Sequence, residues 1–299
     1  MTQRPPHTLV AIGFVIAAVA CFATLDTTTK YVSLSVPVLM ALWFRYVFQA
    51  VATTLVVLPY MGRSVLRTEQ PKLQFLRGIL LFLTSLLAFF SLKYMPVGEF
   101  TAIVMITPLI ITLLAATSLG ERVSPLRWAL VGGGFIGTLI IIRPGSEAFS
   151  WTMLLPLGLV ATNASFQILT SKMARTEAPL TMHFYTGWIG TLLSSVILPF
   201  VWAPVTYGRL WAGMVLMGVT GSVGHFLLIL AYARAPAATL TPYLYAQIGF
   251  AMLGGWLVFA HVPDHWSVLG MVLVALCGAG GAWATLHERR RLQQLAPAA

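Results

Sequence analysis

The chain has 299 residues, of which 58% are hydrophobic and only 9% are charged. Soluble domains carry about 25% charged residues, so this composition excludes a soluble protein with a polar surface. The formal net charge of +10 comes from residues between apolar segments and in the C-terminal tail, which is typical of membrane topology signals and not of a nucleic-acid-binding patch.

Apolar segments of membrane-spanning length follow one another along the chain. About 20 apolar residues in a helix cross a hydrocarbon core about 30 Å thick. The segments are residues 8–31, 37–59, 72–94, 97–119, 125–142, 151–173, 180–201, 209–233, 237–259 and 266–286. No connection between them is long enough for a soluble domain. The sequence therefore predicts an all-α polytopic membrane protein with ten transmembrane helices.

The basic residues predict how these helices are oriented. With the N-terminus inside, thirteen Lys and Arg residues lie on the inner side and four on the outer side, and Arg45 lies within a span. Because cytoplasmic loops carry the excess of Lys and Arg, both termini are expected in the cytoplasm. The expected location is the inner (cytoplasmic) membrane. The inner set is Arg4, Arg63, Arg67, Lys72, Arg77, Arg122, Arg127, Lys172, Arg175, Arg234, Arg289, Arg290 and Arg291, and the outer set is Lys30, Lys93, Arg143 and Arg209.

The second half of the chain repeats the first at an offset of 140 residues. Since each half has an odd number of spans, the second half enters the membrane from the opposite face. Residues 1–146 and 147–299 are thus predicted to be two inverted five-helix repeats around a central cavity, an arrangement typical of secondary transporters. The identical pairs are Phe44 and Phe184, Pro59 and Pro199, Pro96 and Pro236, and Thr101 and Thr241.

Several short motifs of the first half resemble one known domain. They are Lys30, Pro37 and Arg45 in the first two segments, Pro108, Leu119-Gly120-Glu121-Arg122, Trp128, and the glycine run from Gly132. The chain resembles the EamA domain of the drug/metabolite transporter superfamily, and its overall pattern is most similar to the YddG-like amino acid exporters. The second half departs from the pattern, with His261 where Glu121 stands. The resemblance implies a ten-helix carrier of amino acids, other metabolites or drugs.

Charged residues within the spans are the first candidates for function, because charge at bilayer depth is costly. Asp26 and Lys30 have the i, i+4 spacing of an intrahelical ion pair. Asp26 is alternatively a protonation site for coupling. Arg45 either stacks on neighbouring aromatic rings, the structural role that we favour, or binds a substrate carboxylate. Glu99 begins a helix, where an acid complements the helix dipole.

Neutral polar residues near helix midpoints are the second group of candidates. His225 follows a glycine-rich stretch in the middle of the eighth segment, and Ser85 is its repeat mate. Asn163 and Gln167 are an i, i+4 pair in the sixth segment, and Gln247 lies midway along the ninth. Each either lines the cavity as a substrate contact or forms a hydrogen bond that joins helices.

Proline and aromatic residues complete the predicted site. Pro108 and Pro242 disrupt the backbone ladder and are predicted hinges. Met105 and Tyr245 are repeat mates near these prolines and are predicted substrate contacts. Tyr185 is a further predicted contact, with anchoring at the lipid interface as the alternative.

These features predict a secondary active transporter that exports amino acids, aromatic or neutral, or similar small metabolites by alternating access. Its expected partners are a small-molecule substrate and the lipid bilayer. The alternatives are a carrier of drugs or cations from the same superfamily, or a membrane scaffold or enzyme. No cofactor or metal site is expected, since Pro263 interrupts any helix between His261 and His265, and Cys21 and Cys277 lie in apolar runs.

Overall fold

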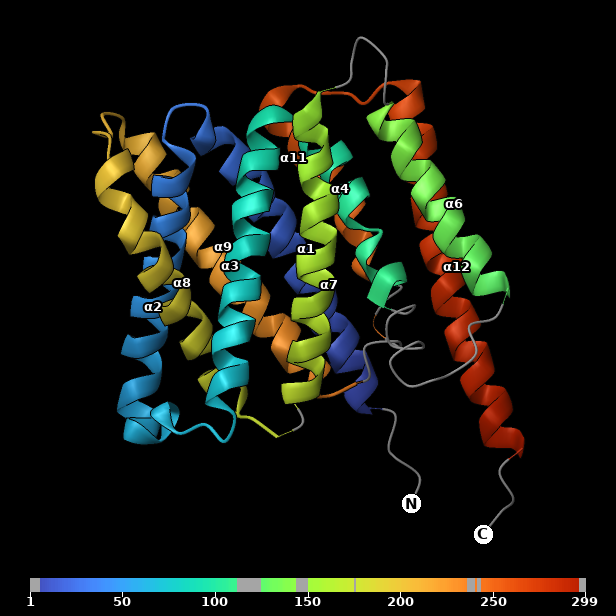
Figure 1. Cartoon of the computed structure of the whole chain (residues 1–299), viewed down its shortest axis with the longest axis horizontal. Helices are drawn as coiled ribbons and strands as arrows, with labels where there is room; N and C mark the ends of the chain where they lie inside the picture. Colours follow the sequence, from blue (N-terminus) through green and yellow to red (C-terminus); the bar gives the residue numbers. More distant parts are fainter. Residues whose placement is uncertain are drawn as a thin grey trace.

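The computed structural model is a bundle of long helices (Figure 1). It describes residues 6–111, 125–143, 150–174, 176–235, 240 and 243–295, and the regular elements in this part of the chain are all helical. The helices are α1 (Pro6–Ser33), α2 (Val38–Met61), α3 (Pro71–Tyr94), α4 (Val97–Val104), α6 (Pro125–Ile142), α7 (Leu155–Met173), α8 (Pro179–Val201), α9 (Gly208–Tyr232), α11 (Ala246–Phe259) and α12 (His265–Leu295), with short 3-10 turns at Gly62–Leu66 and Trp151–Leu154.

The helices have the lengths and composition of membrane spans. Six of those described are long and apolar enough to cross a bilayer, and four shorter apolar helices cover 97–111, 128–142, 246–259 and 265–281. They follow the chain in the order predicted from the apolar segments. The all-α polytopic fold is therefore confirmed.

Helices of the first half pack on helices of the second half. α2 packs on α8, α4 on α11 and α6 on α12, while α1 packs along α9 and α3 along α7. Exchanging the two halves converts this set of pairs into itself, as a pseudo-twofold axis requires. α1 and α7, the first helices of the halves, run in opposite directions in Figure 1. The predicted boundary at residue 146 lies outside the described residues.

The fourth predicted span, residues 97–119, is interrupted within the described residues, as the predicted disruption at Pro108 requires. α4 ends at Val104, and Met105 and Ile106 form a turn before the helix resumes at Thr107. The cause is Pro108, which has no N–H to donate to the carbonyl of Val104 and whose ring clashes with that carbonyl. Tyr245, the repeat mate of Met105, also occupies a turn, directly before α11.

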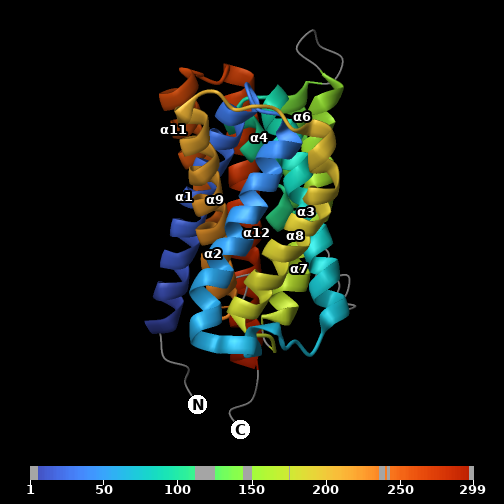
Figure 2. The ribbon, with the colours of Figure 1, turned by 90° about the vertical axis from the view of Figure 1, so that its left-hand side faces the viewer.

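α6 and α12 form a pair at one side of the bundle, opposite the side closed by α2 and α8 (Figures 1 and 2). Their backbones meet at Gly137 and Gly270: a Cβ on Gly137 would lie 2.9 Å from the carbonyl oxygen of Gly270. Small residues permit this approach, which membrane helices use because burial from water does not drive their association. Gly137 of α6 thus has a packing role.

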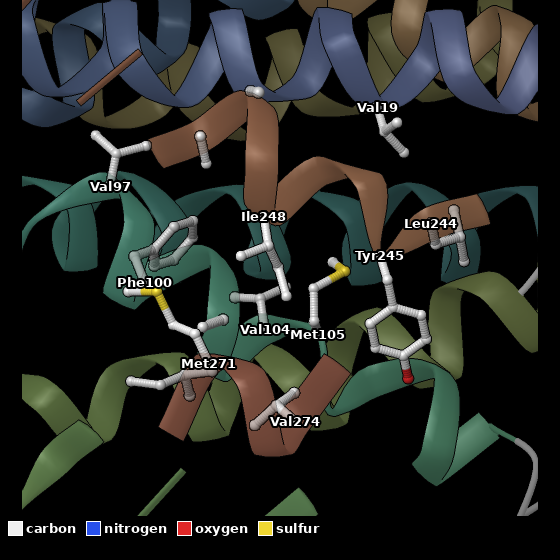
Figure 3. Packing of buried hydrophobic residues seen from close by; sticks show 14 of the residues in the cluster. Val19, Val97, Phe100, Val104, Met105, Leu244, Tyr245, Ile248, Met271 and Val274 are labelled. Carbon is white, nitrogen blue, oxygen red and sulfur yellow. The ribbon is translucent and has the colours of Figure 1, made fainter. Parts of the chain in front are cut away.

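The core beside this pair is apolar. Phe100 and Val104 of α4, Ile248 of α11, and Met271 and Val274 of α12 interdigitate there (Figure 3). This layer separates the α6–α12 pair from the polar centre of the bundle.

Candidate functional site

A cavity lies at the centre of the bundle between the two halves. Its volume is about 110 Å³, which is below the range of about 300–1,000 Å³ typical of small-molecule sites. The lining comes from α1, α2, α3, α4, α7, α9 and the start of α11: Phe22, Leu25, Asp26, Arg45, Leu81, Thr84, Ser85, Ala88, Phe89, Phe100, Val104, Met105, Thr107, Pro108, Leu159, Asn163, Phe166, Gln167, His225, Leu228, Leu244 and Gln247.

Most of the candidate site residues singled out from the sequence line this cavity. Those in the lining are Asp26, Arg45, Ser85, Met105, Pro108, Asn163, Gln167, His225 and Gln247. They come from both halves of the chain, so the cavity exists only when the halves are packed together. Lys30, Tyr185 and Tyr245 do not belong to the lining, and Pro242 lies outside the described residues.

Arg45 is buried on the cavity wall with only 1% of its surface exposed. Its Nη2 donates to Ser85 Oγ at 2.8 Å, and its guanidinium lies 4.0 Å from the centroid of the Tyr46 ring. The Tyr46 hydroxyl also donates to Ser85 Oγ, at 3.0 Å. Nε and Nη1 of Arg45 have no partner among the described residues. A buried donor without a partner costs about 1–3 kcal/mol. The expected stacking on an aromatic ring therefore does not explain why Nε and Nη1 are left without acceptors.

Asp26 and Lys30 have different partners, and the predicted intrahelical ion pair is wrong. Asp26 Oδ2 accepts a hydrogen bond from Gln247 Nε2 at 3.2 Å, a contact between α1 and α11. Lys30 Nζ instead donates to the carbonyl oxygens of Leu92 at 3.2 Å and Met95 at 2.9 Å. The i, i+4 spacing permits an ion pair on one helix. In the structure, both side chains instead form hydrogen bonds with residues outside α1.

The two amides of α7 are joined into a short chain of hydrogen bonds. Gln167 Nε2 donates to Asn163 Oδ1 at 3.2 Å, and Gln167 Oε1 accepts from the Tyr232 hydroxyl at 2.6 Å. These residues therefore hold α7 against α9 and line the cavity at the same time. The predicted hydrogen bond between helices is present, and substrate contact stays a prediction.

His225 is surrounded by aromatic rings. Its ring centroid lies 4.8 Å from that of Phe22 and 6.1 Å from that of Phe166. Gly224 makes this possible, because a Cβ there would lie 2.8 Å from the Phe22 ring. The imidazole thus presents a polar edge within an otherwise apolar part of the wall.

Two predicted aromatic contacts lie elsewhere. The Tyr185 hydroxyl donates to the carbonyl of Leu66 at 2.9 Å, beside the connection between α2 and α3. The Tyr245 ring points toward α12 (Figure 3), where Gly278 leaves room for it. Both residues were assigned to the cavity from composition and repeat position, which do not determine the face of a helix that a side chain occupies.

Buried polar residues outside the cavity escaped the sequence reading. Arg77, counted there as a cytoplasmic charge, is 1% exposed. Its Nε donates to Thr170 Oγ1 at 2.8 Å, and its Nη1 donates to the carbonyl of Met182 at 2.9 Å and to Thr186 Oγ1. His183 Nε2 lies 3.0 Å from Ser222 Oγ. The short Thr and Ser side chains that pair with these groups give no distinctive sequence signal.

Polar contacts join the two halves at the end of the bundle away from the start of α1. Glu99 Oε1 lies 2.9 Å from His261 Nε2, and Arg143 Nη2 lies 2.8 Å from Asp264 Oδ2. Glu99 was expected only to complement a helix dipole, and the structure adds this cross-half partner. Among the described residues, no cluster of three or more His, Cys, Asp or Glu side chains is arranged to hold a metal ion.

The comparisons with known proteins agree with this architecture. Residues 9–143 match the EamA-like transporter family. A riboflavin transporter of Rhizobium johnstonii is 30% identical over 92% of this chain and 91% of its own length. The chain belongs to the EamA-like transporter family. It is a multi-pass membrane protein and a transporter of small molecules, not an enzyme.

Other relatives of this EamA-like transporter differ in substrate and in direction. An S-adenosylmethionine uptake transporter of Rickettsia bellii is 27% identical over 89% of this chain and 90% of its own. A pseudopaline exporter of Pseudomonas aeruginosa is 25% identical over 90% and 95%. A crystal structure with 20% identity aligns with a TM-score of 0.64 over 96% of this chain and 99% of its own, which shows the shared fold.

Proposed function

We propose that this EamA-like protein is a secondary active transporter that exports amino acids or similar small metabolites across the cytoplasmic membrane by alternating access. The observation that carries the proposal is the central cavity, which is lined by polar side chains from both halves. Rocking of the halves about such a cavity would expose it to each side in turn. Residues 1–146 and 147–299 are the proposed rocking units.

The proposed substrate contacts are the polar lining residues Ser85, Asn163, Gln167, His225 and Gln247, with Met105 on the apolar wall. The broken helix at Pro108 is the proposed hinge in the first half, and Pro242 is its counterpart. The excess of Lys and Arg on one side supports placing both termini in the cytoplasm. The relatives are named for small organic substrates, which supports the proposal that the substrate is a small organic molecule.

A carrier of cationic compounds is the second candidate. Asp26 lies in the cavity lining and can attract a cation. The same wall carries Arg45, which would repel one. The amino acid proposal accommodates both charges.

Counterflow into liposomes tests the proposal. The purified protein is reconstituted with an unlabelled amino acid inside, and uptake of the same labelled compound is followed for a panel of amino acids. We expect substrate-dependent accumulation, and we expect His225→Ala and Asn163→Ala to lower it about five- to tenfold because each removes a cavity contact worth about 1 kcal/mol.

Tyr185→Phe is the matched control, because the hydroxyl that it removes contacts Leu66 and not the cavity. Its transport should equal that of the wild type. Accumulation of none of the amino acids would sink the export proposal. Wild-type transport by both Ala variants would show that the substrate binds elsewhere.

A further inference from the structure

Two opposite charges lie on the wall of one cavity, and both retain hydrogen-bonding capacity. Resting on the proposed function, we propose that Arg45 and Asp26 select a zwitterion: Arg45 takes the substrate's carboxylate and Asp26 takes its ammonium group. Both side chains line the central cavity, Arg45 from α2 and Asp26 from α1. The substrate class is then an amino acid with both of its charged groups free.

The unused donors of Arg45 point to a carboxylate. Only Nη2 has a protein acceptor among the described residues, Ser85 Oγ, and Nε and Nη1 are left without one. A guanidinium presents its N–H groups as planar forks that match the two oxygens of a carboxylate. Each fork includes Nη2, so a bidentate carboxylate would take the second hydrogen of Nη2 together with Nη1 or Nε. The contacts with Ser85 and the Tyr46 ring hold the fork in place before the substrate arrives.

A glycine on the facing helix lets the Arg45 guanidinium lie close to the backbone of that helix. A Cβ on Gly221 of α9 would lie 3.2 Å from Nη1 of Arg45. No side chain of that residue therefore competes for the guanidinium. A helix of the second half thus shapes the binding site of a first-half arginine.

Asp26 supplies the opposite charge. Its Oδ2 accepts one hydrogen bond, from Gln247, whereas an ionised carboxylate can accept about four. An ammonium group carries three donors and no acceptor. With one acid and one guanidinium the wall is neutral as a whole, so a substrate of zero net charge leaves no uncompensated charge at bilayer depth.

The remainder of the wall suits an apolar side chain. Phe22, Phe89, Phe100 and Phe166 all line the cavity. Aromatic rings pack favourably on one another with centroids about 4.5–7 Å apart. Phenylalanine is therefore the first probe.

Matched compounds separate the two charges. The apparent Kd of the purified protein in detergent is measured by thermal shift for L-phenylalanine, for L-phenylalaninamide, which lacks the carboxylate, and for 3-phenylpropionate, which lacks the ammonium group. We expect the amino acid to bind at least about tenfold more tightly than either analogue, because each analogue leaves one buried charge unpaired.

Each charge then has its own variant. Arg45→Gln should bind L-phenylalanine and L-phenylalaninamide equally but still prefer L-phenylalanine to 3-phenylpropionate. Asp26→Asn should bind L-phenylalanine and 3-phenylpropionate equally but still prefer L-phenylalanine to L-phenylalaninamide. Arg45→Lys, which keeps the charge but loses the planar fork, should retain only part of the carboxylate preference. Lys93→Gln and Glu69→Gln replace exposed charges and should change neither preference.

The outcomes separate this inference from the proposed function. If the wild type binds L-phenylalaninamide as tightly as L-phenylalanine, the inference is overturned. It is also overturned if the Arg45→Gln protein folds and its affinity for all three compounds falls by the same factor. If liposomes transport a solute without these charges, such as riboflavin, and no amino acid binds, the inference fails while transport stands. If no compound is transported at all, the proposed function itself fails.

Discussion

Gly137 and Gly132 lie on the same helix, and their surroundings differ completely. A Cβ on Gly137 would meet the backbone of α12 at the Gly270 carbonyl oxygen, and a Cβ on Gly132 would meet nothing within 4 Å. Backbone cannot move aside as the end of a side chain can. The requirement for glycine thus belongs to one position of the run and not to the other.

Gly137→Ala should therefore destabilise the protein by about 1–3 kcal/mol, the usual cost of inserting atoms into a packed interface. Gly132→Ala is the matched control and should be neutral or slightly stabilising, because alanine favours the helix. Thermal unfolding of both variants in detergent measures the difference. Equal midpoints would mean that α6 and α12 do not meet at Gly137.

At the scale of the element, α12 begins at a residue that both caps it and joins it to α6. Asp264 Oδ1 accepts the backbone N–H of Ser267 at 2.7 Å, and Oδ2 pairs with Arg143 at 2.8 Å. The Ser267 N–H, chiefly, and the Arg143 guanidinium hold the pKa of Asp264 below its ordinary value of 3.8. Its ionised form is thus favoured by folding.

Asp264→Ala should lower the free energy of unfolding by about 1 kcal/mol at neutral pH, as loss of an N-cap usually does. Because folding lowers the pKa of Asp264, its carboxylate stabilises the folded protein fully above pH 3.8, the ordinary pKa. This stabilisation is lost as the pH falls through the lower pKa of the folded state. The gap in thermal midpoint between variant and wild type should accordingly narrow at pH 3. The exposed Glu69→Ala is the control, and a gap unchanged between pH 7 and pH 3 would contradict the assignment.

The interruption of α4 is another element-scale feature. Pro108 stands four residues after Val104 and removes one backbone hydrogen bond, so the helix stops at that carbonyl. The break brings irregular backbone to the cavity wall, where Met105, Thr107 and Pro108 all contribute to the lining. Irregular backbone is tolerated at membrane depth where it borders a cavity.

At the scale of the molecule, the halves are joined by contacts at the end where α4 begins and α11 ends. The contact between Glu99 and His261 is one of them, with 2.9 Å between Oε1 and Nε2. Rocking of the halves requires such contacts to separate once in each transport cycle. Linking them covalently should therefore stop the cycle.

Glu99→Cys combined with His261→Cys, in a background with Cys21 and Cys277 replaced by Ala, should lose most liposome transport after treatment with a short bis-maleimide. We expect less than about a tenth of the untreated rate if the rocking mechanism holds. Linking Lys30→Cys to Met95→Cys, both within the first half, is the control and should be tolerated. Full transport by the completely linked Glu99–His261 pair would rule out rocking about this contact.

The sequence by itself determined the class of fold and the order of the apolar helices along the chain. Helical hydrogen bonding satisfies the backbone locally, and a span must match the bilayer, so length and apolar composition are sufficient for these features. It also indicated most of the cavity's polar residues, because a polar group at bilayer depth needs a partner or water.

Only the tertiary structure decided which partner each of those groups takes. Asp26 contacts Gln247 and not Lys30, Arg77 is buried among Thr side chains, and Tyr245 turns toward α12. These outcomes depend on which helix face meets which neighbour, and thus on residues far apart in the chain: 221 positions separate Asp26 from Gln247, and 93 separate Arg77 from Thr170. Spacing along one helix restricts those contacts but does not select among them.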